Sequence, residues 1–438
     1  MAPPPPPAVE ISRPMNRDAD RSVPIHPPPT RSVPCCSFPV ACLQETKLGD
    51  RYDSARKIEK AIRRIQPGFR IRVEHFAAIL LVEQEDLQHE DEGGHLSHER
   101  CNPWQLKRRL EKISPFCKHY MLHLDPRNLD LKHWVHAKPV PLVSQPLLSP
   151  EMSYDEIQLS THYRASFRTQ TTIDEVPKNI AQRGERECRE RDGYKCVITG
   201  RSSPRVFWLI PKGFNDTKNN NNATGNFEAG CVYLTKIDLL DDIHSATELG
   251  KTHKVWNMLC VDPAIYDTLA QGLCAFKYIG IEELRDGHCQ VQLKFFWMPK
   301  LPPRFGQIMD LNAIMKFNPK DNAQGFISFQ NIERGKDISA DLTMFKNSGC
   351  PMPDRIDKRE AISTPPLLSG KDVNIKMPKR ESRLFKTVIE IHWACVTFTA
   401  LCGGAGRAWY LIGMNQADGS LQPRWEQYKE DKHTGLTD

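Results

Sequence analysis

The stretch WNMLCVDPAIYDTL, residues 256–269, contains two carboxylates whose type and spacing could hold a divalent cation. Asp262 stands one helical turn before Tyr266 and would share its helix face, and Asp267 is adjacent to Tyr266. Carboxylate oxygens are hard ligands that suit magnesium. Asp262 is also followed by Pro263, a pair typical of a helix N-cap and first helical position. We favour the N-cap interpretation and expect no metal. Magnesium is the expected cofactor only if these carboxylates form a site.

Histidines and cysteines are the other side chains that could act as bases or ligands. His253, in the polar run GKTHK, and His244, in DDIHS, are the nearest histidines upstream of that stretch. Their polar neighbours favour a surface position, and His253 is kept as a reserve ligand beside the two carboxylates. The 14 cysteines include no Cys-x-x-Cys pair, which removes the most common signature of a four-cysteine zinc site.

A basic segment precedes this part of the chain. The sequence RECRERDGYKCVITG begins at Arg186 and predicts a short basic helix, a turn, and a strand at 196–199, with a second strand at 205–210. Cationic side chains here could contact nucleic-acid phosphates, because neutralising a phosphate releases counterions and favours binding. The candidate side chains are Arg186, Arg189, Arg191 and Lys195.

Helices are expected on the N-terminal side of this segment. From Tyr52, apolar residues recur at helical spacing on one side and lysines and arginines on the other. Further helices are predicted at 73–81 and from Asn102, which precedes Pro103 and suits a cap. The polar stretch NDTKNNNNATGNFEAG, from Asn215, has no periodicity and predicts an exposed loop.

Composition predicts a folded centre with loose ends. A chain of 438 residues has room for two or three compact units. Residues 1–48 are rich in proline and predict a disordered tail, which a proline-recognising domain could bind. No apolar secretory signal begins the sequence, and the apolar run from Thr387 contains Glu390 and His392. We therefore expect no membrane association and a cytoplasmic or nuclear location.

Several separated pieces of sequence, in order, resemble the HNH-endonuclease-like proteins that are widespread in filamentous fungi. RDGYKCVITG resembles the opening of their HNH domain, and VFWLIP stands in the place of an Ala-His-Ile-x-Pro-like motif. WNMLCVDPAIYDTL stands where that family has Trp-Asn followed by a histidine, and GLCAFKYIGI and KFFWMP resemble the strands that follow. The resemblance covers about a quarter of the chain.

The resemblance assigns three positions and departs from the family at two. In the family, one histidine is the general base, the asparagine orients its loop, and the last histidine helps to hold a divalent metal. By position these roles fall to Trp208, Asn257 and Tyr266. An indole has no lone pair that can accept a proton at neutral pH, and a phenol, with a pKa of about 10, is a poor replacement for imidazole. We therefore expect impaired catalysis.

The fold that the resemblance implies is α+β. An HNH-like ββα core is expected inside a larger mixed domain, preceded by a helical region and the disordered tail. The expected divisions are 1–48 for the tail, 49–180 for the helical region and linker, 181–300 for the HNH-nuclease-like domain, and 301–438 for a C-terminal extension that packs on the core.

Three functions remain open from the sequence. We rank first a catalytically impaired HNH-derived protein whose fold is able to bind nucleic acid or another macromolecule. The second is an active metal-dependent endonuclease with a site rebuilt from Asp262, Asp267 or His253. The third is a non-catalytic protein-interaction module that uses the proline-rich tail. A net charge of +6 permits contact with nucleic acid but does not require it.

Overall fold

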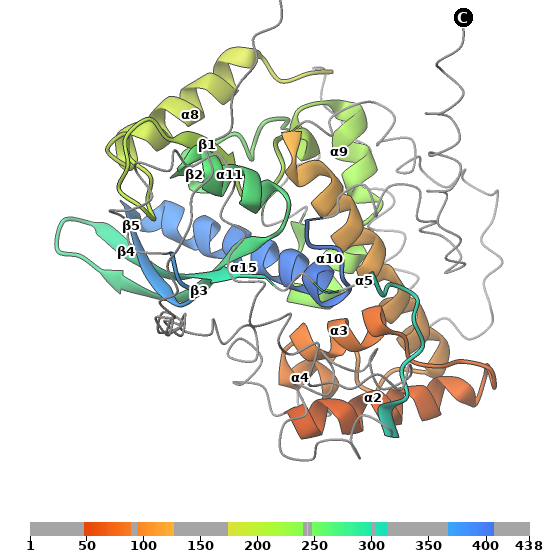
Figure 1. Ribbon diagram of the computed structural model, residues 1–438. Helices are drawn as coiled ribbons and strands as arrows, with labels where there is room; N and C mark the ends of the chain where they lie inside the picture. Colours follow the sequence, from red (N-terminus) through yellow and green to blue (C-terminus); the bar gives the residue numbers. More distant parts are fainter. Residues whose placement is uncertain are drawn as a thin grey trace, which may run out of the picture. The chain divides into compact units, whose positions relative to one another are not determined.

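A computed structural model describes residues 48–88, 94–126, 174–239, 243, 248–298, 301, 303–312 and 367–406. The chain divides into two compact units, 1–35 and 36–438, and every described residue belongs to the second. The predicted proline-rich tail, most of the linker, and His244 lie outside the described residues. The described part mixes helices with antiparallel sheets, which confirms the α+β class (Figure 1).

The first four described helices form a packed group. They are α2 (Leu48–Arg63), α3 (Val73–Leu81), α4 (Gln84–Leu87) and α5 (Pro103–Leu124), and α2, α3 and α5 contact one another (Figure 1). The cap predicted at Asn102 is confirmed. Its side chain accepts a hydrogen bond from the Gln105 backbone at 2.9 Å, and the Gln105 side chain accepts one from the Asn102 backbone at 3.2 Å. The helices at 52 and 73–81 are likewise confirmed.

Two short strands and a helix form the part of the fold that holds the candidate site. Strand β1 (Arg205–Trp208) pairs antiparallel with β2 (Met258–Val261), and α8 (Lys178–Arg191) packs on both. Helix α11 (Pro263–Ala270) follows β2 and packs on β1. Asp262 caps it by accepting a hydrogen bond from the Ala264 backbone at 3.0 Å, so the N-cap interpretation is confirmed.

Two local predictions on either side of β1 are wrong. Residues 197–199 form a turn instead of a strand, because the chain folds back at Gly200, whose φ of +71° suits glycine. The polar stretch from Asn215 forms helices α9 (Lys218–Gly225) and α10 (Glu228–Thr235) instead of a loop. The Thr217 side chain caps α9, and the buried Asn215 and Asn221 side chains hydrogen-bond to each other at 2.8 Å. These bonds replace the missing apolar periodicity.

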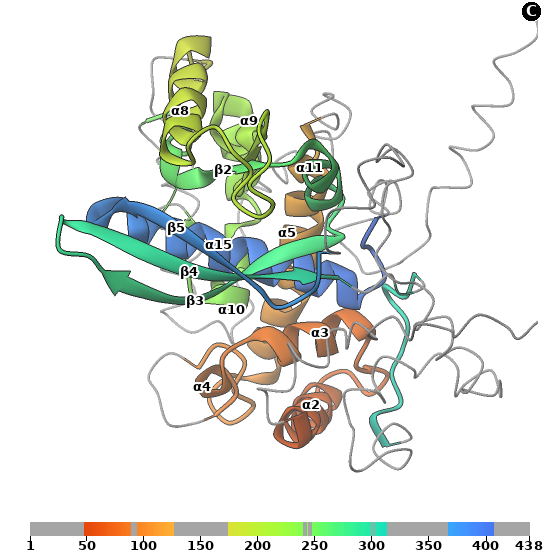
Figure 2. The ribbon, with the colours of Figure 1, turned by 60° about the vertical axis from the view of Figure 1, so that its left-hand side comes forward.

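A three-stranded sheet and one long helix complete the described fold. The antiparallel order is β3 (Cys274–Glu283), β4 (His288–Trp297) and β5 (Lys371–Pro378), and β5 comes from much later in the chain than its partner β4. Helix α15 (Lys379–Leu401) packs along this sheet and against α5, as Figure 2 shows. The main hydrophobic core therefore draws on the N-terminal helices, the sheets and α15 together.

Helix α15 is the most apolar long element in the described part of the chain. Its length and composition would allow it to cross a membrane, but 72% of its most apolar window is buried inside the structure, as in a core helix. Phe398 and Leu401 are fully buried, and Trp393 is partly buried. The Tyr120 hydroxyl lies 2.8 Å from Nδ1 of His392, which ties α15 to α5.

Candidate functional site

Trp208, which the HNH resemblance predicts at the general-base position, ends β1 and packs against α8. Its side chain is 9% exposed, and the edge of the His253 ring meets it at 5.0 Å between ring centroids. The ring belongs to a small apolar cluster separate from the main core. The other members are Ala181, Cys188, Val206, Val255, Met258 and Cys260. Trp208 therefore fixes the place where α8 meets the β1–β2 pair.

Asn257, which the HNH resemblance matches to the family's asparagine, is fully buried and bonds to the chain just after Trp208. Its Oδ1 accepts a hydrogen bond from the Ile210 backbone at 2.7 Å. Its Nδ2 donates to the carbonyl oxygens of Ile210 at 3.0 Å and of Thr252 at 3.1 Å. These three bonds hold the chain that leaves β1 against the segment that enters β2. The role of Asn257 here is to position backbone.

Tyr266, which the HNH resemblance predicts at the position of the last histidine, lies on α11 and is 6% exposed. The guanidinium carbon of Arg205 lies 3.6 Å from the centre of the Tyr266 ring, and the Phe207 ring meets its edge at 5.7 Å. A guanidinium over an aromatic face is a favourable cation–π arrangement. The ring thus serves as a support for Arg205.

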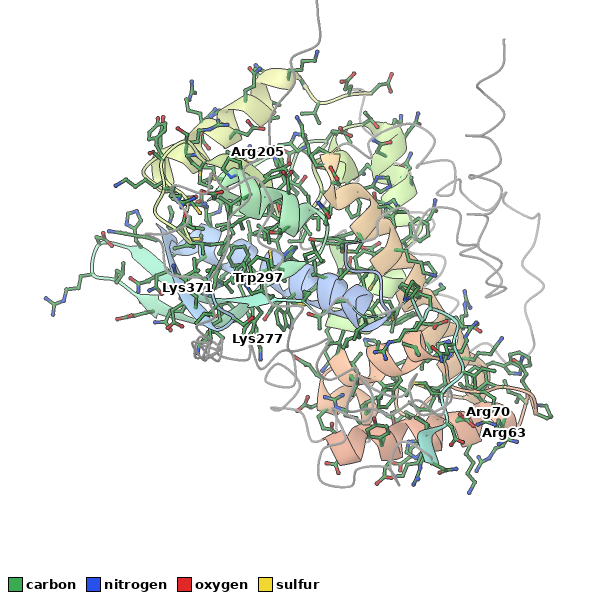
Figure 3. All side chains as sticks on the ribbon, in the orientation of Figure 1. Arg63, Arg70, Arg205, Lys277, Trp297 and Lys371 are labelled. Atoms are coloured by element: carbon green, nitrogen blue, oxygen red, sulfur yellow. The ribbon has the colours of Figure 1, made fainter. Side chains whose placement is uncertain are left out.

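Trp208 and Tyr266 line the same cleft, which has a volume of about 350 Å³. Cationic side chains exceed acidic ones along it. The charged side chains that line it are Glu185, Arg189, Arg205 and Lys212, and Nζ of Lys212 lies 5.7 Å from the centre of the Trp208 ring. We call this site the Trp208–Tyr266 cleft. Figure 3 labels Arg205 beside it.

Of the three cationic side chains that line this cleft, the sequence predicted one as a phosphate contact and did not indicate the other two. Arg189 was predicted, and it lies 3.6 Å from Glu185 on the same helix. Arg205 and Lys212 were missed, although they flank the segment VFWLIP on either side and would project near any site formed there. Arg186 and Lys195 are exposed and do not line the cleft.

The reserve metal ligands are engaged elsewhere. Asp262 caps α11 and forms an ion pair with Arg201 at 3.7 Å. Asp267 is exposed and pairs with Arg205 at 3.3 Å. Each carboxylate therefore already has a cationic partner, which opposes the concentration of negative charge that a divalent ion needs.

His253 is not a surface residue, and that prediction is wrong. It is 1% exposed, and its Nε2 lies 3.3 Å from the carbonyl oxygen of Lys212. Burial lowers the pKa of His253 to about 4, because a charged imidazole loses its hydration there. The ring is neutral at pH 7, but it lies behind Trp208 and does not line the cleft. A base in this position does not reach a water molecule in the cleft.

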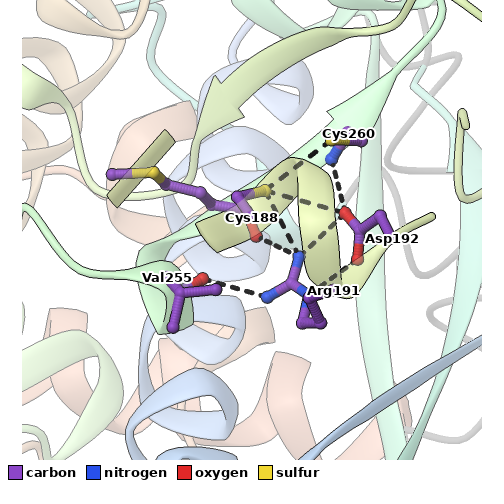
Figure 4. A network of polar contacts seen from close by, with 6 residues as sticks. Cys188, Arg191, Asp192, Val255 and Cys260 are labelled. Carbon is purple, nitrogen blue, oxygen red and sulfur yellow. Dashed lines mark hydrogen bonds and ion pairs between the residues drawn. The ribbon is translucent and has the colours of Figure 1, made fainter. Parts of the chain in front are cut away.

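Arg191, predicted to contact phosphate, instead points into the molecule (Figure 4). Its guanidinium binds both carboxylate oxygens of Asp192, at 2.6 and 2.9 Å, and donates to the carbonyl oxygens of Val255 at 2.9 Å and Met258 at 2.7 Å. Burial opposes a charge here, but Asp192 outweighs it and raises the pKa of Arg191. Arg191 therefore joins α8 to the start of β2 and is not available to a nucleic acid.

The same network contains the one group of possible metal ligands found among the described residues. Cys188, Asp192 and Cys260 have ligand atoms within 4.8 Å of one another. Nη2 of Arg191 donates to Cys188 Sγ at 3.5 Å and to Asp192, so a cation already occupies this centre (Figure 4). The hydrogen bond with Cys260, and burial, raise the pKa of the Cys188 thiol. A protonated thiol beside a guanidinium does not fit a metal.

Comparisons with protein-family models, with curated proteins and with solved structures gave no match. The HNH resemblance therefore stays a prediction. The structure contains a small cationic cleft that is lined by two aromatic side chains, and a buried asparagine fixes the backbone beside it.

Proposed function

We propose that this chain is a nucleic-acid-binding protein that does not hydrolyse its ligand, and that phosphates of DNA or RNA bind in the Trp208–Tyr266 cleft. The observation that carries the proposal is the convergence of Arg189, Arg205 and Lys212 on one cleft. Guanidinium and ammonium groups bind phosphate through charge-assisted hydrogen bonds. The bound phosphates release counterions, and binding is stronger at low salt.

The arrangement of β1, β2 and α11 supports the link with HNH proteins. Strands β1 and β2 pair antiparallel and α11 follows β2, which agrees with the ββα order that the resemblance implies, although α9 and α10 are inserted between the two strands. The positions equivalent to the two catalytic histidines both lie on the cleft, and Asn257 braces the chain beside them. On this proposal, the cleft is a former reactive site that keeps its phosphate contacts.

The absence of cleavage follows from the side chains at the reacting positions. The indole nitrogen of Trp208 only donates hydrogen bonds and accepts no proton. General-base catalysis is typically worth about a hundred- to ten-thousand-fold in rate, so its loss removes most of the activity. Asp262 and Asp267 are paired with arginines and do not supply a replacement site.

Binding is tested by fluorescence anisotropy with a labelled single strand, its duplex and the matching RNA over a salt series. We compare the natural protein with an Arg205→Gln/Lys212→Gln double variant. Loss of two phosphate contacts makes the negative slope of log binding constant against log salt concentration shallower by about 2. The control is Arg285→Gln, which removes a cation from the exposed turn between β3 and β4 and leaves the slope unchanged. No salt-dependent binding, or equal loss in the control, contradicts the proposal.

Cleavage is tested separately, with plasmid DNA and magnesium or manganese. The natural protein is expected to leave the plasmid intact. EDTA-sensitive cutting by the natural protein would show that a working site has been rebuilt. A Trp208→His/Tyr266→His variant asks whether the two imidazoles restore activity. Cutting by this variant alone supports the view that these two positions stopped the chemistry.

A further inference from the structure

A second cationic cleft lies along helix α2 and shares no residue with the Trp208–Tyr266 cleft. Its volume is about 560 Å³, within the range of about 300–1,000 Å³ that is usual for small-molecule sites. We call it the α2 cleft. Its lining residues are Arg56, Glu59, Lys60, Arg63, Arg64, Pro67, Arg70, Asp310, Leu311 and Asn312. Figure 3 shows Arg63 and Arg70 well separated from Arg205.

Two segments far apart in the sequence build this cleft. The lining residues of α2 fall on one flank of the helix, beside the face that buries Ala55, Ile58 and Ile62, because they recur at helical spacing. The other wall, 310–312, is attached to the chain after α2 by backbone bonding. Met309 donates to the carbonyl oxygen of Ile71 at 2.9 Å. The shape of the cleft is thus fixed by tertiary structure.

The charges in the α2 cleft do not balance. Five cationic side chains and two acidic ones line it, which leaves a net charge of +3. Glu59 is already engaged, because it pairs with Arg70 at 3.2 Å and accepts the Ile71 backbone hydrogen bond at 2.9 Å. Like charges gathered in a concave surface focus a positive potential there.

The favourable interaction of cations with the helix dipole explains only part of the excess of cationic side chains in the α2 cleft. Lys60 and Arg63 lie in the last turn of α2, where cations interact favourably with the helix dipole. Arg56, Arg64 and Arg70 do not lie in that turn. Arg56 makes only a weak, exposed pair with Asp53 at 3.7 Å, and its buried Nε has no hydrogen-bond partner among the described residues. The net positive charge of the cleft and this one donor without a partner point to an anionic ligand.

We propose that the α2 cleft binds a compact polyphosphate, a small molecule with two or more adjacent phosphate groups. Guanidinium groups bind phosphate oxygens through paired N–H donors, and several of them, on a fixed frame, suit neighbouring phosphates. The volume of the cleft is large enough to hold such a ligand. This inference does not depend on the function proposed for the Trp208–Tyr266 cleft.

The test is calorimetric titration of the full chain with inorganic tripolyphosphate, at fixed ionic strength, against a titration with sulfate. The test variant is Arg56→Gln/Arg64→Gln. The control variant, Arg285→Gln/Arg380→Gln, removes two exposed cations from other parts of the chain. It therefore has the same net charge as the test variant. In the Arg205→Gln/Lys212→Gln background, which disables the other proposed phosphate-binding cleft, we expect one tripolyphosphate per chain, with affinity lowered about tenfold or more in the test variant only. Circular dichroism of both variants checks that they fold.

Three results would overturn the inference. The first is the absence of tripolyphosphate binding, or binding no stronger than that of sulfate. The second is an equal loss in the test and control variants, which would mean general charge attraction only. The third is a test variant that loses oligonucleotide binding while tripolyphosphate binding is unchanged, which would assign the α2 cleft to nucleic acid. Because the Arg205→Gln/Lys212→Gln variant probes the other cleft, the two proposals fail separately.

Discussion

Replacing Asn257 by alanine should destabilise the protein strongly, because this side chain satisfies three buried backbone groups. The variant leaves the Ile210 N–H, the Ile210 carbonyl and the Thr252 carbonyl without the bonds that Asn257 supplies. A buried polar group without a partner costs roughly 1–3 kcal/mol, and partial relaxation limits the sum. We therefore expect the free energy of unfolding to fall by about 3–5 kcal/mol.

The change is measured by urea unfolding, followed by tryptophan fluorescence. Asn219→Ala is the matched control, since Asn219 is exposed on α9, and it should change the free energy of unfolding by less than about 0.5 kcal/mol. If Asn257→Ala loses less than about 1 kcal/mol, the three hydrogen bonds do not hold the site together and the reasoning is refuted.

An Asn257→Asp variant gives an independent pH signature of the same bonds. The introduced carboxyl would keep an acceptor for the Ile210 N–H but would face the two carbonyl oxygens of Ile210 and Thr252. Burial and these oxygens raise the pKa of that carboxyl in the folded state above its unfolded value of about 4. The variant should be most stable in acid and lose stability as pH rises through the folded pKa, relative to the natural protein. A pH-independent difference would contradict this geometry.

Three further predictions concern the surrounding frame. Arg191→Met leaves Asp192 buried without its cation and should cost about 3–5 kcal/mol in urea unfolding, with part of the loss recovered by adding Asp192→Asn. Gly230→Ala should lower the melting temperature and cost at least about 1–3 kcal/mol, because a Cβ there would lie 2.3 Å from the Lys112 carbonyl oxygen of α5. Burial raises the pKa of Asp86 to about 6, so its contribution to stability is present in acid below about pH 4 and is lost as pH rises through 6. Asp86→Asn should remove this pH dependence of the free energy of unfolding, which amounts to at most about 3 kcal/mol. A variant with the same pH profile of unfolding as the natural protein would contradict the prediction.

Helix-capping residues and amphipathic spacing in the sequence predicted several helices of the fold. Asn102 before Pro103 predicted the start of α5, and Asp262 before Pro263 that of α11, because a capping side chain satisfies backbone groups within a few residues. The amphipathic spacing from Tyr52 likewise predicted α2. Such signals need no distant partner.

Side-chain direction was decided by distant contacts. The sequence placed Arg191 among surface cations, but Asp192 and the carbonyl oxygens of Val255 and Met258 draw it inward. His253 stands in a polar run, yet it is buried against Trp208. Helix α9, after Asn215, forms without apolar periodicity, because side-chain hydrogen bonds replace it.

The sequence alone determined the capped and amphipathic helices, and it places Trp208, whose indole cannot accept a proton, where the proposed HNH resemblance has a general base. Only the tertiary structure decided which cations meet there. Arg205, Lys212 and Arg189 come from different elements, and the pairing of β1 with β2 and the packing of α8 bring them to one cleft. The reason is physical: a cap or a helical stripe is fixed by residues within a turn or two, whereas a cleft is fixed by packing among segments that the sequence keeps apart.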